Sequence, residues 1–207
     1  MGRVKAEDRR VEFIEAAVQI IAEHGVNGAT TRRIAERAEA PLATLHYCFS
    51  SKEELFKGIY EHMISVLGDS VWHVRPGAGL GASAASLYRQ LVTWYASDFN
   101  LSNAQLELYF WIKRHDKDAA RRAYQVHIDL LAKKLREGMR DDDDPSLIDP
   151  LSRMIAINAD GILPQLMVFD DEGYLENMTE AICESFRQLA DSHRLFVRGS
   201  KTTPTLT

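Results

Sequence analysis

Residues 30–55, TTRRIAERAEAPLATLHYCFSSKEEL, decide how the front of this chain folds. Thr30 and Thr31 supply a helix start, because a Thr hydroxyl can accept a hydrogen bond from a free N–H group of the first turn. The apolar face of that helix ends shortly before Pro41. Pro41 is expected to be the first residue of a second short helix, residues 42–47, where its missing N–H group costs nothing.

Longer helices flank these two short ones. Before them, apolar residues recur with helical period from residue 11 until Gly25, which is expected to end the helix. After them, Ser51 and Glu54 form a capping box that opens a helix over residues 51–67. Two short helices joined by a tight turn and packed on a longer first helix make a helix-turn-helix, whose second short helix fits the DNA major groove.

The residues in this stretch are more specific than the spacing. They are Thr30-Thr31-Arg32-Arg33-Ile34-Ala35, Ala38, Thr44-Leu45, Phe49 and Ser51-Lys52-Glu53-Glu54-Leu55. With them the chain closely resembles the TetR family of transcriptional regulators, over about residues 11–60. The resemblance implies an all-α fold: an N-terminal three-helix helix-turn-helix DNA-binding domain, then a C-terminal helical ligand-binding and dimerisation domain.

Carried over position by position, the resemblance implies a set of DNA-binding residues. They are Thr31, Arg32, Leu42, Thr44, His46, Tyr47 and Lys52. Thr31 and Lys52 are expected to contact phosphates and Arg32 a base, since Arg can donate two hydrogen bonds to guanine. The alternative is that any one of these side chains is an ordinary exposed residue.

Three positions depart from the family pattern. Glu39 replaces the usual turn glycine, Pro41 replaces a common serine, and residues 46–48, His-Tyr-Cys, replace Tyr-x-Tyr or Tyr-x-His. If Glu39 adopts a positive φ, the strain is on the order of 1 kcal/mol. Its carboxylate near phosphates would also weaken DNA binding, so an unusual sequence preference is expected.

Beyond residue 83 the sequence predicts further helices and no strand. Their expected ranges are 84–99, 102–115, 117–140, 146–169 and 172–193. We place a DNA-binding domain at residues 1–50, a ligand-binding and dimerisation domain at 51–197 and a disordered tail at 198–207. The boundary precedes the helix over residues 51–67 because that helix is expected to link the two parts.

Aromatic residues gather in the second part of the chain. Eight of the 18 fall between Tyr88 and Tyr124, where even spacing would give about three. Either a tightly packed aromatic core or an apolar ligand pocket explains this enrichment. The candidate pocket residues are Trp94, Tyr95, Phe99, Tyr109, Trp111, His115, Tyr124, His127 and Gln165.

Composition limits the other classes of function. The net charge is −5, and residues 1–60, with nine basic and nine acidic side chains, contribute none of it, so a histone-like DNA-wrapping protein is excluded. Two cysteines without metal spacing, no signal peptide and no apolar run long enough for a bilayer favour a cytoplasmic protein that does not enter membranes. We expect no cofactor, no metal and no catalytic residues.

The resemblance implies a repressor that binds a palindromic operator as a homodimer and is released by a small molecule, although an activator has the same architecture. The expected partners are double-stranded DNA, a second copy of the chain and an unidentified, largely apolar effector. Two alternatives stay open. One is an all-α enzyme that uses His115, His127 or Asp160 as acid or base, and the other is a protein-interaction module whose helix-turn-helix no longer binds DNA.

Overall fold

The computed structural model describes residues 6–169 and 172–192, and within these ranges the chain forms helices and no strand. The elements are α1 (Ala6–Gly28), α2 (Thr31–Arg37), α3 (Leu42–Cys48), α4 (Lys52–Val66), the π-helical turn η1 (Leu67–Val71), α5 (Leu80–Ser97), α6 (Phe99–His115), α7 (Lys117–Gly138), the 3-10 turn η2 (Pro145–Leu147), α8 (Ile148–Val168) and α9 (Glu172–Asp191). The expected all-α fold is confirmed. The tail expected at 198–207 lies outside the described residues.

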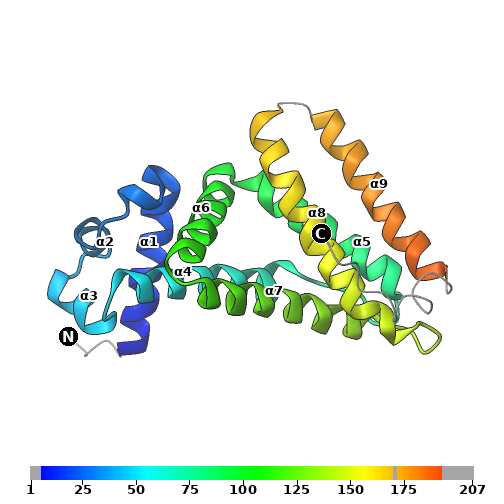
Figure 1. The fold of residues 1–207 in the computed structure, drawn as a ribbon, viewed down its shortest axis with the longest axis horizontal. Coiled ribbons are helices and arrows are strands. Elements are labelled where there is room, and N and C mark those ends of the chain that lie inside the picture. Colours follow the sequence, from blue (N-terminus) through cyan, green and yellow to red (C-terminus); the bar gives the residue numbers. More distant parts are fainter. Residues whose placement is uncertain (1–5, 170–171, 193–207) are drawn as a thin grey trace, which may run out of the picture.

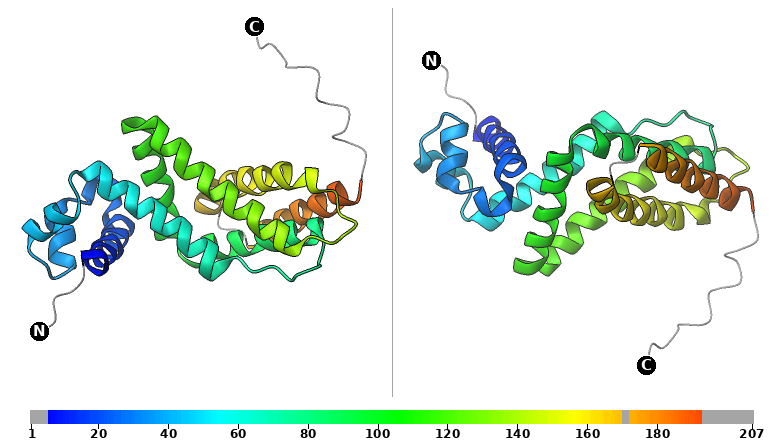
Figure 2. Two further views of the ribbon diagram at one scale, coloured as in Figure 1. Left: turned by 90° about the horizontal axis from the view of Figure 1, so that it is seen from below. Right: turned by 90° about the horizontal axis from the view of Figure 1, so that it is seen from above.

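The helices form a small head and a larger body (Figure 1). Helices α1, α2 and α3 make the head, and α5 to α9 make the body, where α5 packs against both α8 and α9. Helix α4 runs from the head into the body and lies beside α6 and α7, as the turned views in Figure 2 also show. In the described part of the chain, no helix is both long and apolar enough to cross a membrane.

A continuous apolar core holds the head together. Phe13 of α1, Ile34 of α2, Leu45 of α3 and Leu55 of α4 are almost fully buried in it. Each comes from the apolar face that the sequence pattern predicts, and burying a side chain of this size contributes roughly 1.5–3 kcal/mol. Gly25 has a φ of 69°, which breaks the regular helix near the end of α1 as expected.

Some helices begin earlier than the sequence indicates. Helix α5 was expected from residue 84 but begins at Leu80, whose N–H group donates to the Asp143 carboxylate over 2.9 Å. Helix α6 was expected from residue 102 but begins at Phe99, after Asp98 caps it through the N–H group of Leu101. A cap from 63 residues away leaves no local signal, which explains the error for α5.

The turn between α2 and α3 contains the expected strain. Glu39 has a φ of 49° and is the one non-glycine residue in the described ranges with a positive φ. Pro41 was expected as the first residue of α3, but its backbone is extended, with φ −60° and ψ 138°, so it occupies the cap position instead. It cannot cap the helix with a side-chain hydrogen bond, as a serine there would.

We predict that Glu39→Gly raises the free energy of unfolding by about 0.5–1 kcal/mol, because glycine has no Cβ to oppose a positive φ. Urea denaturation of the purified variants measures this change. Glu39→Ala is the control, since it removes the charge and keeps the Cβ. Equal stabilisation by both variants would mean that charge, and not backbone strain, is responsible.

A histidine lies deep in the body. His127 of α7 is buried, its ring stacks on Trp72 with 5.2 Å between centroids, and its Nε2 atom has no hydrogen-bond partner. Burial lowers the pKa of His127 from 6.5 to about 4. The folded protein therefore keeps this ring neutral at a pH where the unfolded chain binds a proton.

We predict that the protein loses stability as the pH falls from about 6.5 to about 4, by up to about 3 kcal/mol from His127 alone. Above pH 6.5 the ring is neutral in both states and contributes no pH dependence. Urea denaturation at pH 7.5 and 4.5 should show a smaller acid-induced loss in His127→Phe than in wild type. The exposed His46→Phe serves as the control, and identical losses in all three proteins would contradict the prediction.

Candidate nucleic-acid interface and ligand site

Helix α3 presents one face to the core and the other to solvent. Leu45 and Cys48 point inward and are buried, whereas Leu42 and His46 are exposed and Tyr47 is 84% exposed. An aromatic side chain so exposed on a short helix contributes nothing to the core. A single helix with a free outer face has the dimensions needed to enter the major groove, which is about 12 Å wide.

The remaining predicted DNA contacts surround this face. Arg32 on α2 has 81% of its side chain exposed and donates from Nε to Glu36 over 2.9 Å. Lys52, at the start of α4, lies with its Nζ atom 4.8 Å from the centre of the Phe56 ring. None of the seven predicted DNA-binding residues is buried, and Thr31, Thr44 and Lys52 are half-buried. They are therefore accessible to DNA, although their contacts remain predictions.

Arg10 fixes the end of α3, and the sequence pattern gave no sign of it. Its guanidinium donates to the backbone carbonyl of Cys48 and to the Glu54 carboxylate, and it lies 4.2 Å from the centre of the Phe49 ring. Hydrogen bonds from Ser50, then the hydrogen bond and the charge of Arg10, lower the pKa of Glu54. Arg10 is 38 residues from Cys48, so only the folded head brings the two together.

A second arginine attaches α2 to α1. Arg37 donates to both carboxylate oxygens of Glu23, over 3.0 and 2.6 Å, and to Gln19 over 3.1 Å. The hydrogen bond from Arg37 lowers the pKa of Glu23. A bidentate Arg–carboxylate pair defines an orientation better than a single contact does. It therefore helps to hold α2 at one angle on α1.

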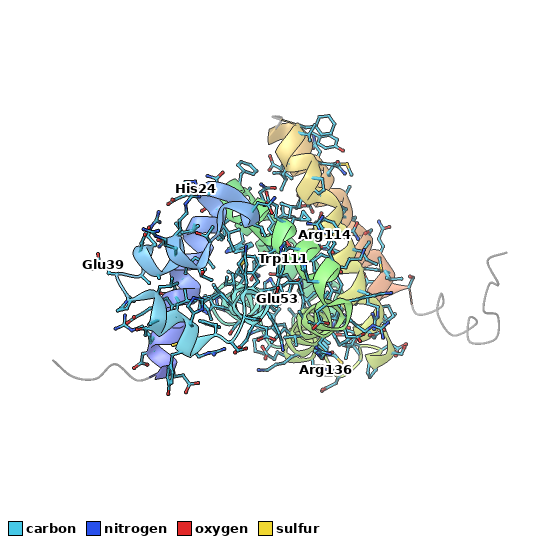
Figure 3. The ribbon with its side chains drawn as sticks, turned by 60° about the vertical axis from the view of Figure 1, so that its left-hand side comes forward. His24, Glu39, Glu53, Trp111, Arg114 and Arg136 are labelled. Carbon is cyan, nitrogen blue, oxygen red and sulfur yellow. The ribbon has the colours of Figure 1, made fainter. Side chains whose placement is uncertain are left out.

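Glu39 lies at the outer edge of the head, where Figure 3 shows it far from the body. It belongs to the lining of a surface pocket of about 270 Å³ together with Glu12 and Glu15 of α1. These carboxylates would repel a DNA phosphate that approached them. Binding at this edge is therefore disfavoured, as the departure at Glu39 predicts.

Part of the predicted ligand site does come together in the body. Tyr109 and Tyr124 have ring centroids 5.7 Å apart, and Tyr124 and His127 have centroids 6.0 Å apart. Tyr60 of α4, which was not predicted, joins them at 6.0 Å from Tyr109. The Tyr95 hydroxyl is buried and has no hydrogen-bond partner. These rings come from α4, α5, α6 and α7.

Other members of the predicted pocket lie elsewhere. Trp111 packs edge-on against Phe56 at 4.7 Å, and His115 stacks on Trp111 at 3.8 Å. Both line a pocket of about 190 Å³ with Glu53 and other residues of α4, at the junction of head and body (Figure 3). Sequence enrichment could not separate these rings from the tyrosines, because α6 turns different residues toward the head and toward the body.

The last three predicted pocket residues are also dispersed. Trp94 is half-buried beside Tyr95, with 5.5 Å between ring centroids. Phe99 is exposed at the start of α6. Gln165 accepts a hydrogen bond from the Tyr174 hydroxyl over 2.8 Å, which ties α8 to α9. The structure thus supports a smaller candidate site than the one predicted.

A pocket of about 300 Å³ opens beside the tyrosines. Its lining is Tyr109, Lys113, Lys117, Ala120, Arg121, Tyr124, Gln125, Ile128 and Arg153. It is more polar than the apolar pocket predicted from the aromatic residues. In residues 6–169 and 172–192, no three His, Cys, Asp or Glu side chains lie close enough together to hold a metal ion.

The head and the body are joined by a direct hydrogen bond. Glu107 of α6 accepts from the backbone N–H group of Val26 over 2.9 Å, immediately after the break at Gly25. Asn103, one turn earlier, donates to the same carboxylate over 3.3 Å. A shift of α6 would therefore act on the end of α1, which carries α2 and α3.

Comparisons with known proteins agree with this architecture. Residues 13–59 match the family model for bacterial regulatory proteins, tetR family. The nicotine-responsive transcriptional repressor HdnoR of Paenarthrobacter nicotinovorans is 32% identical over 136 residues, which cover 64% of this chain and 70% of that protein.

Solved structures share the fold at lower identity. A transcriptional regulator from Rhodococcus sp. Rha1 superposes with a TM-score of 0.68 at 17% identity, over 88% of this chain and 97% of that one. The multidrug binding protein EbrR in complex with ethidium superposes with a TM-score of 0.63 at 21% identity, over 84% and 98%. The helix-turn-helix head, the helical body and these matches lead to one conclusion: the chain belongs to the TetR family of DNA-binding transcriptional regulators, and not to a class of enzymes.

Proposed function

We propose that this regulator is a repressor that binds a palindromic operator as a homodimer and leaves it when a small molecule binds. The observation that carries the proposal is the free outer face of α3, with Leu42, His46 and Tyr47 exposed while Arg10 fixes the end of the helix. The similarity to a nicotine-responsive repressor supports both repression and control by a small molecule. A helix-turn-helix that bound only proteins would not require an exposed outer face on α3 with the helix end fixed by Arg10.

The proposed DNA contacts divide by chemistry. Thr31 and Lys52 bind phosphates, which positions the head without selecting a sequence. Arg32 exchanges its bond to Glu36 for a guanine, and His46, Tyr47 and Thr44 face the groove. Leu42 contacts a thymine methyl group. Residues 1–50 act as the DNA-binding domain and residues 51–197 as the ligand-binding and dimerisation domain.

A second copy of the chain is the proposed cover for an apolar face on α8 and α9. Ile157 is 65% exposed and Val168 74% exposed, and Phe169, Tyr174 and Met178 are also exposed. Exposed apolar side chains in such a group mark a protein interface. Pairing α8 and α9 of two copies makes a four-helix bundle and holds two α3 helices for two half-sites about 34 Å apart.

Ligand control requires the two recognition helices to change their spacing. Two of the tyrosines, Tyr60 and Tyr109, lie on α4 and α6, and these helices also touch the head. A ligand that favours a different position of α6 acts on α1 through Glu107 and Val26. The change in the free energy of DNA binding equals the difference between the ligand's binding free energies for the DNA-bound and the released form. This coupling is typically about 1–3 kcal/mol.

Selection from a genomic DNA library at fixed salt concentration tests the proposed DNA contacts of the head. We expect wild type to enrich one palindrome, Arg32→Ala and His46→Ala to lose base preference within it, and Lys52→Ala to weaken binding to all sequences alike. Lys52→Ala should also reduce the slope of log affinity against log salt by about 1, because one phosphate contact is lost.

The matched control is Lys133→Ala on α7, an exposed lysine remote from the head. It should leave both affinity and sequence preference unchanged. Equal affinity of wild type for all DNA, or salt-independent binding, would contradict the proposed role of α2 and α3.

For the dimer, we predict that Ile157→Asp shifts the protein from dimer to monomer and weakens binding to the palindrome at least 10-fold, because the interface would have to bury an unpaired charge. Analytical ultracentrifugation and operator titration measure the two effects. Asn177→Asp, on the side of α9 that carries Glu180 and Glu184, is the control. A wild-type protein that is monomeric at micromolar concentration would refute the interface.

A further inference from the structure

One carboxylate in the body has no basic partner. Asp160 lies on α8 and accepts a hydrogen bond from the Tyr124 hydroxyl of α7. Among the described residues it forms no ion pair, although the chain contains 25 lysines and arginines. Neighbouring Arg153 on α8 pairs with Asp149 instead, over 3.0 Å. The negative charge of Asp160 is therefore not neutralised within the described part of the chain.

Tyrosines from several helices surround this carboxylate. The rings of Tyr60, Tyr109 and Tyr124 form a continuous row, with centroid distances of 6.0 and 5.7 Å. The buried hydroxyl of Tyr95 belongs to the same group, because the charge of Asp160 acts on it as well. Tyr109 and Tyr124 also line the pocket of about 300 Å³, so this region is open to a small molecule.

The electrostatics indicate which sign of charge this region favours in a ligand. Burial raises the pKa of Asp160, and burial followed by the Asp160 charge raises the pKa of Tyr60, Tyr95 and Tyr109. Each of these shifts means that additional negative charge is unfavourable here. Asp160 nevertheless remains accessible to solvent. A ligand with a positive charge would relieve the repulsion, and the electron-rich faces of tyrosine rings attract cations within about 6 Å.

We propose that the effector is an organic cation, whose charged nitrogen pairs with Asp160 and whose apolar part lies against Tyr109 and Tyr124. This inference rests on the proposed function of the chain as a ligand-responsive repressor and adds the chemical class of the ligand. The carboxylate supplies the charge selectivity, because a neutral ligand of the same shape gains nothing from it. The rings supply contact area for a hydrocarbon or aromatic group.

The basic side chains of the adjoining pocket favour a rival class, the organic anions. They are Lys113, Lys117, Arg121 and Arg153. All four are exposed, where water and salt screen their charge, and Arg153 is also paired with Asp149. Asp160 is exposed as well, but it accepts a hydrogen bond from Tyr124 at the row of tyrosine rings, so a carboxylate and aromatic faces can act on one cation together. The combination of the carboxylate with the rings therefore favours a cation, and the test also includes an organic anion.

Isothermal titration calorimetry of the full chain with three probes tests the class. The probes are benzyltrimethylammonium, a cation, benzyl alcohol, which is neutral, and phenylacetate, an anion. We expect the cation to bind at least 10-fold more tightly than the other two. Asp160→Asn should weaken cation binding at least 10-fold, and Tyr109→Leu two- to five-fold. Glu137→Gln, which removes an exposed carboxylate near the end of α7, should change nothing.

Thermal melting of each variant shows that it is folded, and sedimentation reports its assembly. Tighter binding of phenylacetate, no detectable binding of the cation at millimolar concentration, or unchanged cation binding in Asp160→Asn would overturn the inference. So would a loss of dimer in Asp160→Asn, because Asp160 would then serve the subunit interface.

An operator titration with and without benzyltrimethylammonium separates the two proposals. If wild type binds its operator but no cation, the ligand class alone fails. If wild type binds the cation through Asp160 but selects no DNA sequence, the proposed repressor function fails and the cation site remains. Release of wild type, and not of Asp160→Asn, from the operator by the cation supports both.

Discussion

The contact of α6 with the head is the interaction on which the rest of the structure depends. Phe56 of α4 is fully buried against Trp111 of α6, and Glu107 of α6 binds the N–H group of Val26. The first contact is apolar and tolerates small sliding movements, whereas the second is directional and joins the body to a single point on α1. Together they make the orientation of α3 depend on the position of α6.

Within the head, apolar packing provides stability, whereas ion pairs orient the helices. The buried side chains of α1, α2 and α3 provide most of the stabilisation, since exposed ion pairs contribute little. Arg10 and Arg37 instead orient the two short helices, which are seven residues each and too short to be stable alone. The carboxylates that hold these arginines also keep the head free of net positive charge, so its DNA affinity depends on a few well-placed contacts.

The sequence predicted the local features of the site well and the distant ones poorly. The cap at Thr30 and the break at Gly25 depend on neighbouring residues and are confirmed, and Glu39 has the positive φ that its place in a turn usually held by glycine had made conceivable. The aromatic enrichment correctly indicated the body but mixed two sites, because Trp111 faces the head while Tyr109 faces Tyr124. Spacing along α6 does not tell which neighbour each face meets.

By itself, the sequence determined the fold class, the family and the short helices of the head. Helical periodicity, capping residues and the motif over residues 30–55 all involve residues that are close together along the chain. Only the tertiary structure decided that Arg10 holds Cys48, that Asp143 caps α5 and that Asp160 stands among tyrosines of other helices. The physical reason is distance along the chain. Hydrogen bonds and charges act over a few ångströms in space, and residues dozens of positions apart become neighbours only when the helices pack.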